Sequence, residues 1–220
     1  MTTWVEPSGG RERGPRGIAT AWVQVLVRPR AFFREAVSPG DQAPGLVFAV
    51  AVVLVAATTR LLVDPSFAPD VGGNRFLAGL LFLAVLALLV TPLALHAAAA
   101  LQIVCLLPVT LRRPAEERAG VSQTVQVVAY ASAPCALAGL PVPALRLVCA
   151  AYGVLLLVVG LATVHDLRIP VAAVLGVPAA VVVFGVWFGG FAAALDVFPW
   201  LDEWWAGIGV WAEGVWRAAA

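Results

Sequence analysis

The sequence contains no lysine, little charge of any kind and only three cysteines. Charged residues make up 12% of the 220 and hydrophobic residues 61%, and the mean hydropathy is +0.93. Soluble domains carry about 25% charged residues, so this composition excludes an ordinary soluble domain. Cys105, Cys135 and Cys149 lack the spacing of a zinc site and give no disulfide framework. The composition indicates an integral membrane protein.

Five apolar runs are long enough to cross a bilayer, and none of them contains an aspartate or a glutamate. About 20 apolar residues in a helix span roughly 30 Å of hydrocarbon. The predicted spans are 44–63, 76–107, 121–140, 144–164 and 169–195. The second run is about 48 Å long as one helix, so we expect it to be tilted, to be kinked at Pro92, or to project from the membrane. The predicted fold is an all-α, polytopic bundle of five transmembrane helices.

Amphipathic segments are predicted at both ends of this bundle. Residues 1–17 are polar and predicted to be disordered, and residues 18–43 are predicted to form an amphipathic helix and a turn. An apolar face beside arginines suits a helix in the headgroup layer, or equally a helix packed on the protein's own spans. Residues 196–220 are predicted to form a Trp-rich interfacial helix on the outer face, with docking of a partner protein as the alternative.

The placement of arginine predicts the orientation in the membrane. Ten arginines lie in the amino-terminal segment, the second-to-third loop and the fourth-to-fifth turn: Arg11, Arg13, Arg16, Arg28, Arg30, Arg34, Arg112, Arg113, Arg118 and Arg168. The other four are Arg60, Arg75, Arg146 and Arg217. Basic residues accumulate on the cytoplasmic side of membrane proteins. We therefore expect a multi-pass protein of the cell membrane, with a cytoplasmic amino terminus and an external carboxy terminus.

No constellation of residues in the sequence points to catalysis. Ser132 lies between two alanines rather than in a GxSxG elbow, and His165 is expected at a different depth in the membrane. The sequence has no HExxH motif and no Gly-rich phosphate loop, and its arginines lack the clustering typical of nucleic-acid binding. We expect a protein that is not an enzyme, with no cofactor, no metal and no nucleic-acid partner.

Prolines separate the third and fourth predicted spans. Pro141 and Pro143 flank a single residue, and proline both lacks a backbone donor and restricts the residue before it. The pair predicts a tight corner between two antiparallel helices. Pro134 is expected to loosen the third helix, and Tyr130 to place its hydroxyl against a neighbouring helix. These four residues are interpreted as a structural corner.

Three stretches follow one another in an order that resembles a known family. They are PRAFFREAV (29–37), DQAPGLVFAVAVVLVAATTRLL (41–62) and the segment from Thr124 to Leu167, which includes Tyr130, Pro134 and the exit GLATVHDL. Together, over about residues 18–195, they resemble the Yip domain family, the Ypt/Rab-interacting membrane proteins, in a prokaryotic version for which an archaeal source is open. The resemblance implies five spans and a cytoplasmic amino terminus.

The resemblance also implies a function class. Eukaryotic relatives act in vesicle traffic by binding small GTPases and one another. This chain lacks the acidic Asp-Leu-Tyr-Gly-Pro motif before the first span, which makes binding of a small GTPase doubtful. We expect a non-catalytic scaffold or adaptor that contacts the lipid bilayer and other membrane proteins or itself; the alternative is a small-solute permease or channel acting as an oligomer. The candidate membrane or partner surface is Trp22, Arg28, Arg30, Phe32, Phe33 and Arg34.

Overall fold

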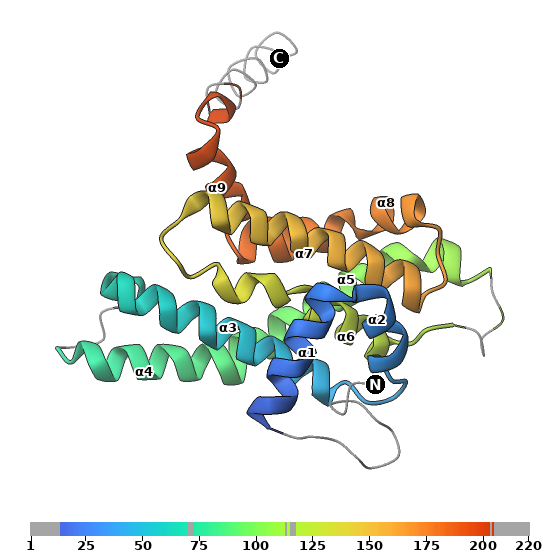
Figure 1. Ribbon diagram of the computed structural model, residues 1–220, viewed down its shortest axis with the longest axis horizontal. Coiled ribbons are helices and arrows are strands. Elements are labelled where there is room, and N and C mark those ends of the chain that lie inside the picture. The colour runs from blue at the N-terminus through green and yellow to red at the C-terminus, as the bar shows by residue number, and fades with distance from the viewer. Residues whose placement is uncertain (1–13, 70–72, 113, 115–117, 203, 205–220) are drawn as a thin grey trace, which may run out of the picture.

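The computed structural model of the chain describes residues 14–69, 73–112, 114, 118–202 and 204 (Figure 1). Within these ranges the chain is all-helical, without a strand. The predictions of a disordered amino-terminal tail and of a Trp-rich outer helix fall mainly on residues 1–13 and 205–220, which lie outside the described residues.

In the described part of the chain, four helices are long and apolar enough to cross a membrane. They are α3 (Ala43–Val63), the helix Arg75–Thr110, α7 (Pro143–Val164) and the helix Ile169–Trp187. Helices α3 and α7 both have proline in their first turn, where the missing N–H would have no partner within the helix. The predicted first and fourth spans therefore agree with the observed helices to within a residue at each end.

The second predicted span is one long helix with an interruption near its middle. It consists of α4 (Arg75–Val85), the π-helical turn η3 (Leu86–Val90) and α5 (Thr91–Thr110). The turn ends two residues before Pro92, which cannot donate a backbone hydrogen bond to the preceding turn. The irregularity thus occurs where the sequence suggested a kink, and it takes the form of a π-turn.

The third predicted span, 121–140, is not a continuous helix. It consists of the short helix α6 (Val121–Ala131) followed by the 3-10 helix η5 (Ala133–Leu137). Pro134 ends the α-helix because its nitrogen cannot donate to the carbonyl of Tyr130. Helix α6 contacts α3, α5 and α7, and Thr124–Ala131 are buried. Irregular backbone at membrane depth is tolerated where protein surrounds it, as it does here.

Hydrogen bonds show that the segment before α3, the start of α6 and the end of α7 lie at the same end of the bundle. The backbone N–H of Gly40 donates to Ser122 Oγ (2.9 Å), and Thr124 Oγ1 lies 3.2 Å from His165 Nε2. At the other end of α3, Gly139 packs directly against Ala56. The rises of α6 and η5 add up to about 26 Å, which is close to the thickness of a bilayer core. The four long helices do not confirm the five-span count, which stays a prediction.

Reporter fusions test whether α6 and η5 together cross the membrane. If they do, a fusion after Val142 is expected on the external side, while fusions after Arg112 and Asp166 are expected on the cytoplasmic side. Alkaline phosphatase and green fluorescent protein activities report the two sides. The same location for Val142 and Arg112 would show that residues 121–140 do not cross, and that four helices cross instead.

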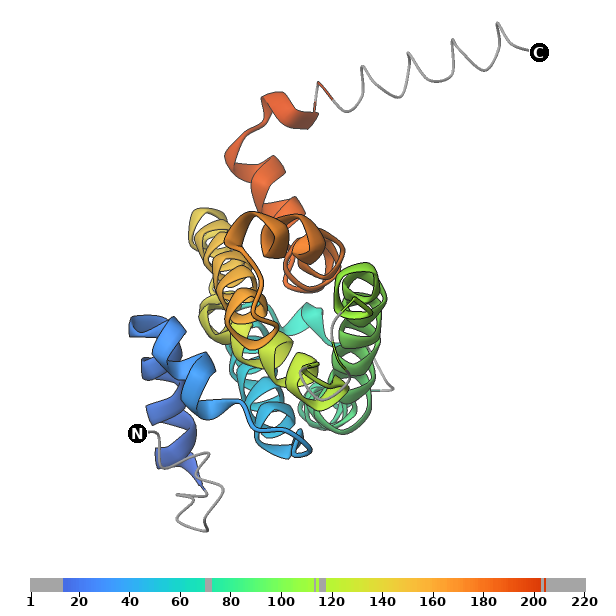
Figure 2. The same ribbon diagram turned by 90° about the vertical axis from the view of Figure 1, so that its right-hand side faces the viewer.

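The fifth predicted span, 169–195, is shorter than the sequence indicated. It consists of α8 (Ile169–Ala180) and the π-helical η6 (Val181–Trp187), and it ends before Gly189, whose φ of 69° is left-handed. A separate helix, α9 (Gly190–Val197), follows and packs against α7. Glycine adopts this left-handed conformation readily, so the chain reverses at this point. Figure 2 shows residues 198–202 (red) leaving the bundle.

Candidate functional site

Two short helices at the amino terminus pack on the flank of the bundle. They are α1 (Pro15–Val27) and α2 (Pro29–Ala36), with Arg28 and Pro29 at the turn between them. Figure 2 shows both helices (blue) on one side of the bundle. Helix α2 contacts α7, and α1 contacts α6 and η5. We refer to α1 and α2 together as the amino-terminal hairpin.

The aromatic side chains of the hairpin are part of the core. Phe32 is 2% exposed and Phe33 is 1% exposed, and the ring of Phe32 meets that of Tyr130 edge-on at 4.8 Å. The structure shows this face packed on the protein's own helices, while the position of the hairpin relative to the headgroup layer stays a prediction. Phe32 and Phe33 are therefore unavailable to a partner.

Polar contacts attach α1 to the irregular backbone of the third segment. The indole Nε1 of Trp22 donates to the carbonyl of Ala133 (2.7 Å), and the hydroxyl of Tyr152 in α7 donates to the carbonyl of Leu26. A buried carbonyl without a partner costs about 1–3 kcal/mol. Trp22 supplies a donor where η5 departs from α-helical geometry, so the hairpin and η5 stabilise each other.

The arginines of the hairpin remain outside. Arg28, Arg30 and Arg34 are all exposed, next to Phe32 and Phe33, which are buried. We call these three residues the arginine edge. Glu35 is also exposed at this surface. The basic half of the predicted surface is therefore accessible, and the buried side chains of Phe32 and Phe33 fix its position on the bundle.

Only part of the predicted corner packs against the hairpin. Tyr130 is fully buried between Phe32 and Phe48, whose ring centroid lies 5.0 Å from its own. Pro134 lies in η5 and is buried as well. Pro141 is exposed, and Pro143 is the first residue of α7. The structure thus brings Tyr130 and Pro134 to the hairpin, whereas Pro141 and Pro143 mark the connection to α7.

A layer of buried polar side chains was not identified as a site from the sequence. The amide of Gln126 donates to the carbonyls of Ser38 (2.8 Å) and Ser122 (3.1 Å), and its oxygen accepts from the N–H of Ser38. Gln102 donates to the carbonyl of Leu175 (3.1 Å). Both side chains are fully buried. These amides join the hairpin's exit to α6 and join α5 to α8; glutamine inside an apolar run was the only signal in the sequence.

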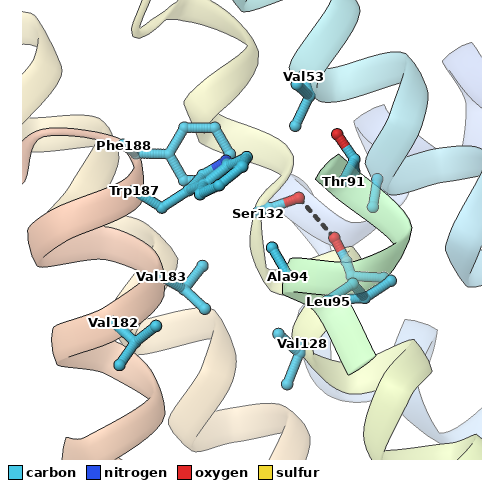
Figure 3. A pocket seen from close by; sticks show the side chains of 12 residues that line it. Val53, Thr91, Ala94, Leu95, Val128, Ser132, Val182, Val183, Trp187 and Phe188 are labelled. Atoms are coloured by element: carbon cyan, nitrogen blue, oxygen red, sulfur yellow. Dashed lines mark hydrogen bonds between the residues drawn. The ribbon is translucent and has the colours of Figure 1, made fainter. Parts of the chain in front are cut away.

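Ser132 and His165 do not form a catalytic pair. The hydroxyl of Ser132 donates to the carbonyl of Ala129 (2.7 Å), as Figure 3 shows. Nε2 of His165 lies 3.2 Å from Thr124 Oγ1 instead. A hydroxyl bonded to its own helix backbone is the common use of serine in a transmembrane segment. Among the described residues, no group of three His, Cys, Asp or Glu side chains could hold a metal ion.

Comparison with known proteins gives one match. Residues 23–190 match the family model of the Yip1 domain, a range that runs from α1 to the start of α9. No curated protein and no solved structure matches the chain. The matched range contains the arginine edge, the buried aromatic cluster and the polar layer.

Proposed function

The chain belongs to the Yip1 domain family, and from this premise we propose that it is a non-catalytic membrane scaffold whose arginine edge binds another membrane protein. The partner would carry acidic side chains, because guanidinium groups recognise carboxylates with paired hydrogen bonds. The arginine edge would face the cytoplasm, as the distribution of arginines predicts.

The observation that carries this proposal is the attachment of the hairpin. Three exposed arginines lie in the same short segment as Phe32 and Phe33, whose side chains are buried in the bundle. A preorganised surface loses less conformational entropy on binding than a flexible tail does. Such a surface suits an adaptor, which presents the same contact residues to a partner while the spans hold it in the membrane.

The alternative of a small-solute permease has less support. A water-filled path would need polar side chains from several helices facing open space. Here the amide nitrogens of Gln102 and Gln126 donate to protein carbonyls, and Thr124 contacts His165. These polar groups hold helices together, which favours the scaffold.

Site-specific photo-crosslinking in native membranes tests the arginine edge. A crosslinker placed at Ala31, which is exposed on α2, is expected to capture a discrete membrane protein. Replacing Arg30 and Arg34 by glutamine should reduce this product about tenfold, because two charge-assisted contacts are lost. The product is measured by gel shift and identified by mass spectrometry.

The matched control changes two other exposed arginines, Arg112 and Arg168, to glutamine. It removes the same charge from loops on the side predicted to be cytoplasmic, and it should leave the Ala31 product unchanged. If both double variants lost the Ala31 product equally, the effect would be one of overall charge and not of the arginine edge. Persistence of the product without Arg30 and Arg34 would rule out the arginine edge as the binding surface.

A further inference from the structure

A cavity with two arginines lies at the end of the bundle opposite Ser38 and His165. It has a volume of about 400 Å³ and lies between α3, α4, α7 and η6. Its wall includes Arg60, Arg146, Phe67, Phe82, Trp187 and Phe188. Arg60 lies one turn before the end of α3 and Arg146 one turn after the start of α7, so both lie near the level of the headgroups if these helices span the bilayer.

The two guanidinium groups have few partners of their own. Arg146 Nε donates to the carbonyl of Ala138 (3.2 Å), and the guanidinium carbon of Arg60 lies 5.2 Å from the centroid of the Phe67 ring. Two carboxylates are near: Asp196 interacts electrostatically with Arg146, and Asp64 does so with Arg60. Ser66 donates two hydrogen bonds to Asp64, which hold the pKa of that carboxyl below its ordinary value.

Two cations that line one cavity repel each other; Asp64 and Asp196 reduce this repulsion, and a bound anion would reduce it further. Single arginines near the ends of membrane helices commonly reach the headgroups. Here two arginines from different helices converge on the same space, and aromatic side chains form the rest of its wall. Arginine pairs with phosphate through two parallel hydrogen bonds, so a phosphate group fits this charge distribution.

A small apolar chamber lies next to the cavity, toward the middle of the bundle. The two share Val53, Trp187 and Phe188, and the chamber adds about 50 Å³. Figure 3 shows Trp187 and Phe188 on one side of it, facing Val53 and Thr91 on the other. An anion with an apolar tail would place its charge between the arginines and the start of its tail in this chamber.

Thr91 supplies a second, independent observation. It lines the chamber and is 4% exposed, and its hydroxyl has no hydrogen-bond partner among the described residues. A buried hydroxyl without a partner costs free energy that a bound acceptor would recover. In a phospholipid the ester carbonyls lie between the phosphate and the acyl chains, so such a carbonyl could accept from Thr91. Free phosphate offers no group at this depth.

We propose that this cavity binds the phosphate of an anionic phospholipid between Arg60 and Arg146, with the acyl ester at Thr91 and the first part of one chain along Trp187 and Phe188. The remainder of the chains would lie in the bilayer beside the bundle. The lipid site and the arginine edge share no residue, so either can fail without the other.

Native mass spectrometry of the full chain in neutral detergent tests the lipid site. The protein is titrated with phosphatidylglycerol, with phosphatidylcholine and with inorganic phosphate. Phosphatidylglycerol is expected to bind about tenfold more tightly than phosphatidylcholine, and an equal concentration of inorganic phosphate should not displace it. Equal binding of the two lipids would overturn the proposal, and displacement by inorganic phosphate would overturn the lipid as the source of the anion.

Two variants connect the binding to these residues. Arg60→Gln should abolish the preference for phosphatidylglycerol, while Arg75→Gln, an exposed arginine of α4, should keep it. Thr91→Val replaces the hydroxyl by a methyl group and should weaken the binding of phosphatidylglycerol a few-fold. This variant keeps the test decisive if Arg60→Gln does not fold. An unchanged preference in Arg60→Gln, or unchanged affinity in Thr91→Val, would contradict the proposed site.

Discussion

Replacing Gly139 by alanine is expected to destabilise the protein by about 3 kcal/mol or more. A Cβ atom at this position would lie 2.0 Å from the carbonyl oxygen of Ala56 and 3.0 Å from the side chain of Thr59. The oxygen belongs to the backbone of α3, so no side-chain rotation can relieve the contact. Either α3 or the connection after η5 would have to move, and the close packing between them would be lost.

Unfolding in mixed micelles with increasing sodium dodecyl sulfate measures this effect. Gly79→Ala is the matched control, because Gly79 lies in α4 and a Cβ atom there would have no neighbour within 4 Å. Alanine is favoured over glycine inside a helix by about 0.5–1 kcal/mol, so the control should be neutral or more stable. If Gly139→Ala were as stable as the parent protein, residue 139 would not pack against α3 as the structure shows.

Helix positions were predictable where an apolar run was bounded by strong sequence signals. The runs of α3 and α7 start beside proline and end at a charged or polar residue, and the predicted bounds agree with the structure to within a residue. Hydropathy reports how much apolar surface a segment has, but it does not report whether its hydrogen bonds are continuous. Residues 121–140 contain no charged side chain and were predicted to be one span, yet Pro134 divides them into two short helices.

The end of the fifth segment shows the same limit. Gly189 lies inside the predicted fifth span, but it is the left-handed position at which the chain reverses. A Cβ atom on the next residue, Gly190, would lie 2.5 Å from the carbonyl oxygen of Phe184. A pair of glycines can serve close helix packing or a chain reversal, and only the contact with Phe184 distinguishes these two uses here.

The sequence predicted that the arginines of the candidate surface are exposed, but it did not predict that the aromatic side chains are buried. Helical periodicity shows that Trp22, Phe32 and Phe33 belong to an apolar face, but the face of a surface helix looks alike whether lipid or protein covers it. The arginines between them must reach a polar environment in either case, so their exposure follows from charge alone. The aromatic side chains are buried because Phe32 contacts Tyr130, which lies more than ninety residues further along the chain. Helical periodicity does not reveal such a distant contact.

Replacing Phe33 by alanine is expected to cost about 3–4 kcal/mol. The ring is 1% exposed and fills the space over Gly160 in α7, where an added Cβ atom would lie 3.0 Å from it. Its removal leaves a cavity between α2 and α7 and forfeits many close contacts, and those contacts are what hold helices together in lipid or detergent. Because the hairpin also supplies Trp22 to the carbonyl of Ala133, loosening α2 should weaken the support of η5 as well.

Phe76→Ala is the matched control for Phe33→Ala, since Phe76 is 76% exposed on α4. It removes the same group from a position where lipid or detergent replaces the lost contacts, so we expect a change below about 0.5 kcal/mol. Both variants are measured by the same unfolding titration in mixed micelles. A hairpin that only lay in the headgroup layer would make the two substitutions equally mild. If the hairpin is part of the bundle, Phe33→Ala must lower the stability much more than Phe76→Ala does. The fixed position of the arginine edge depends on this packing.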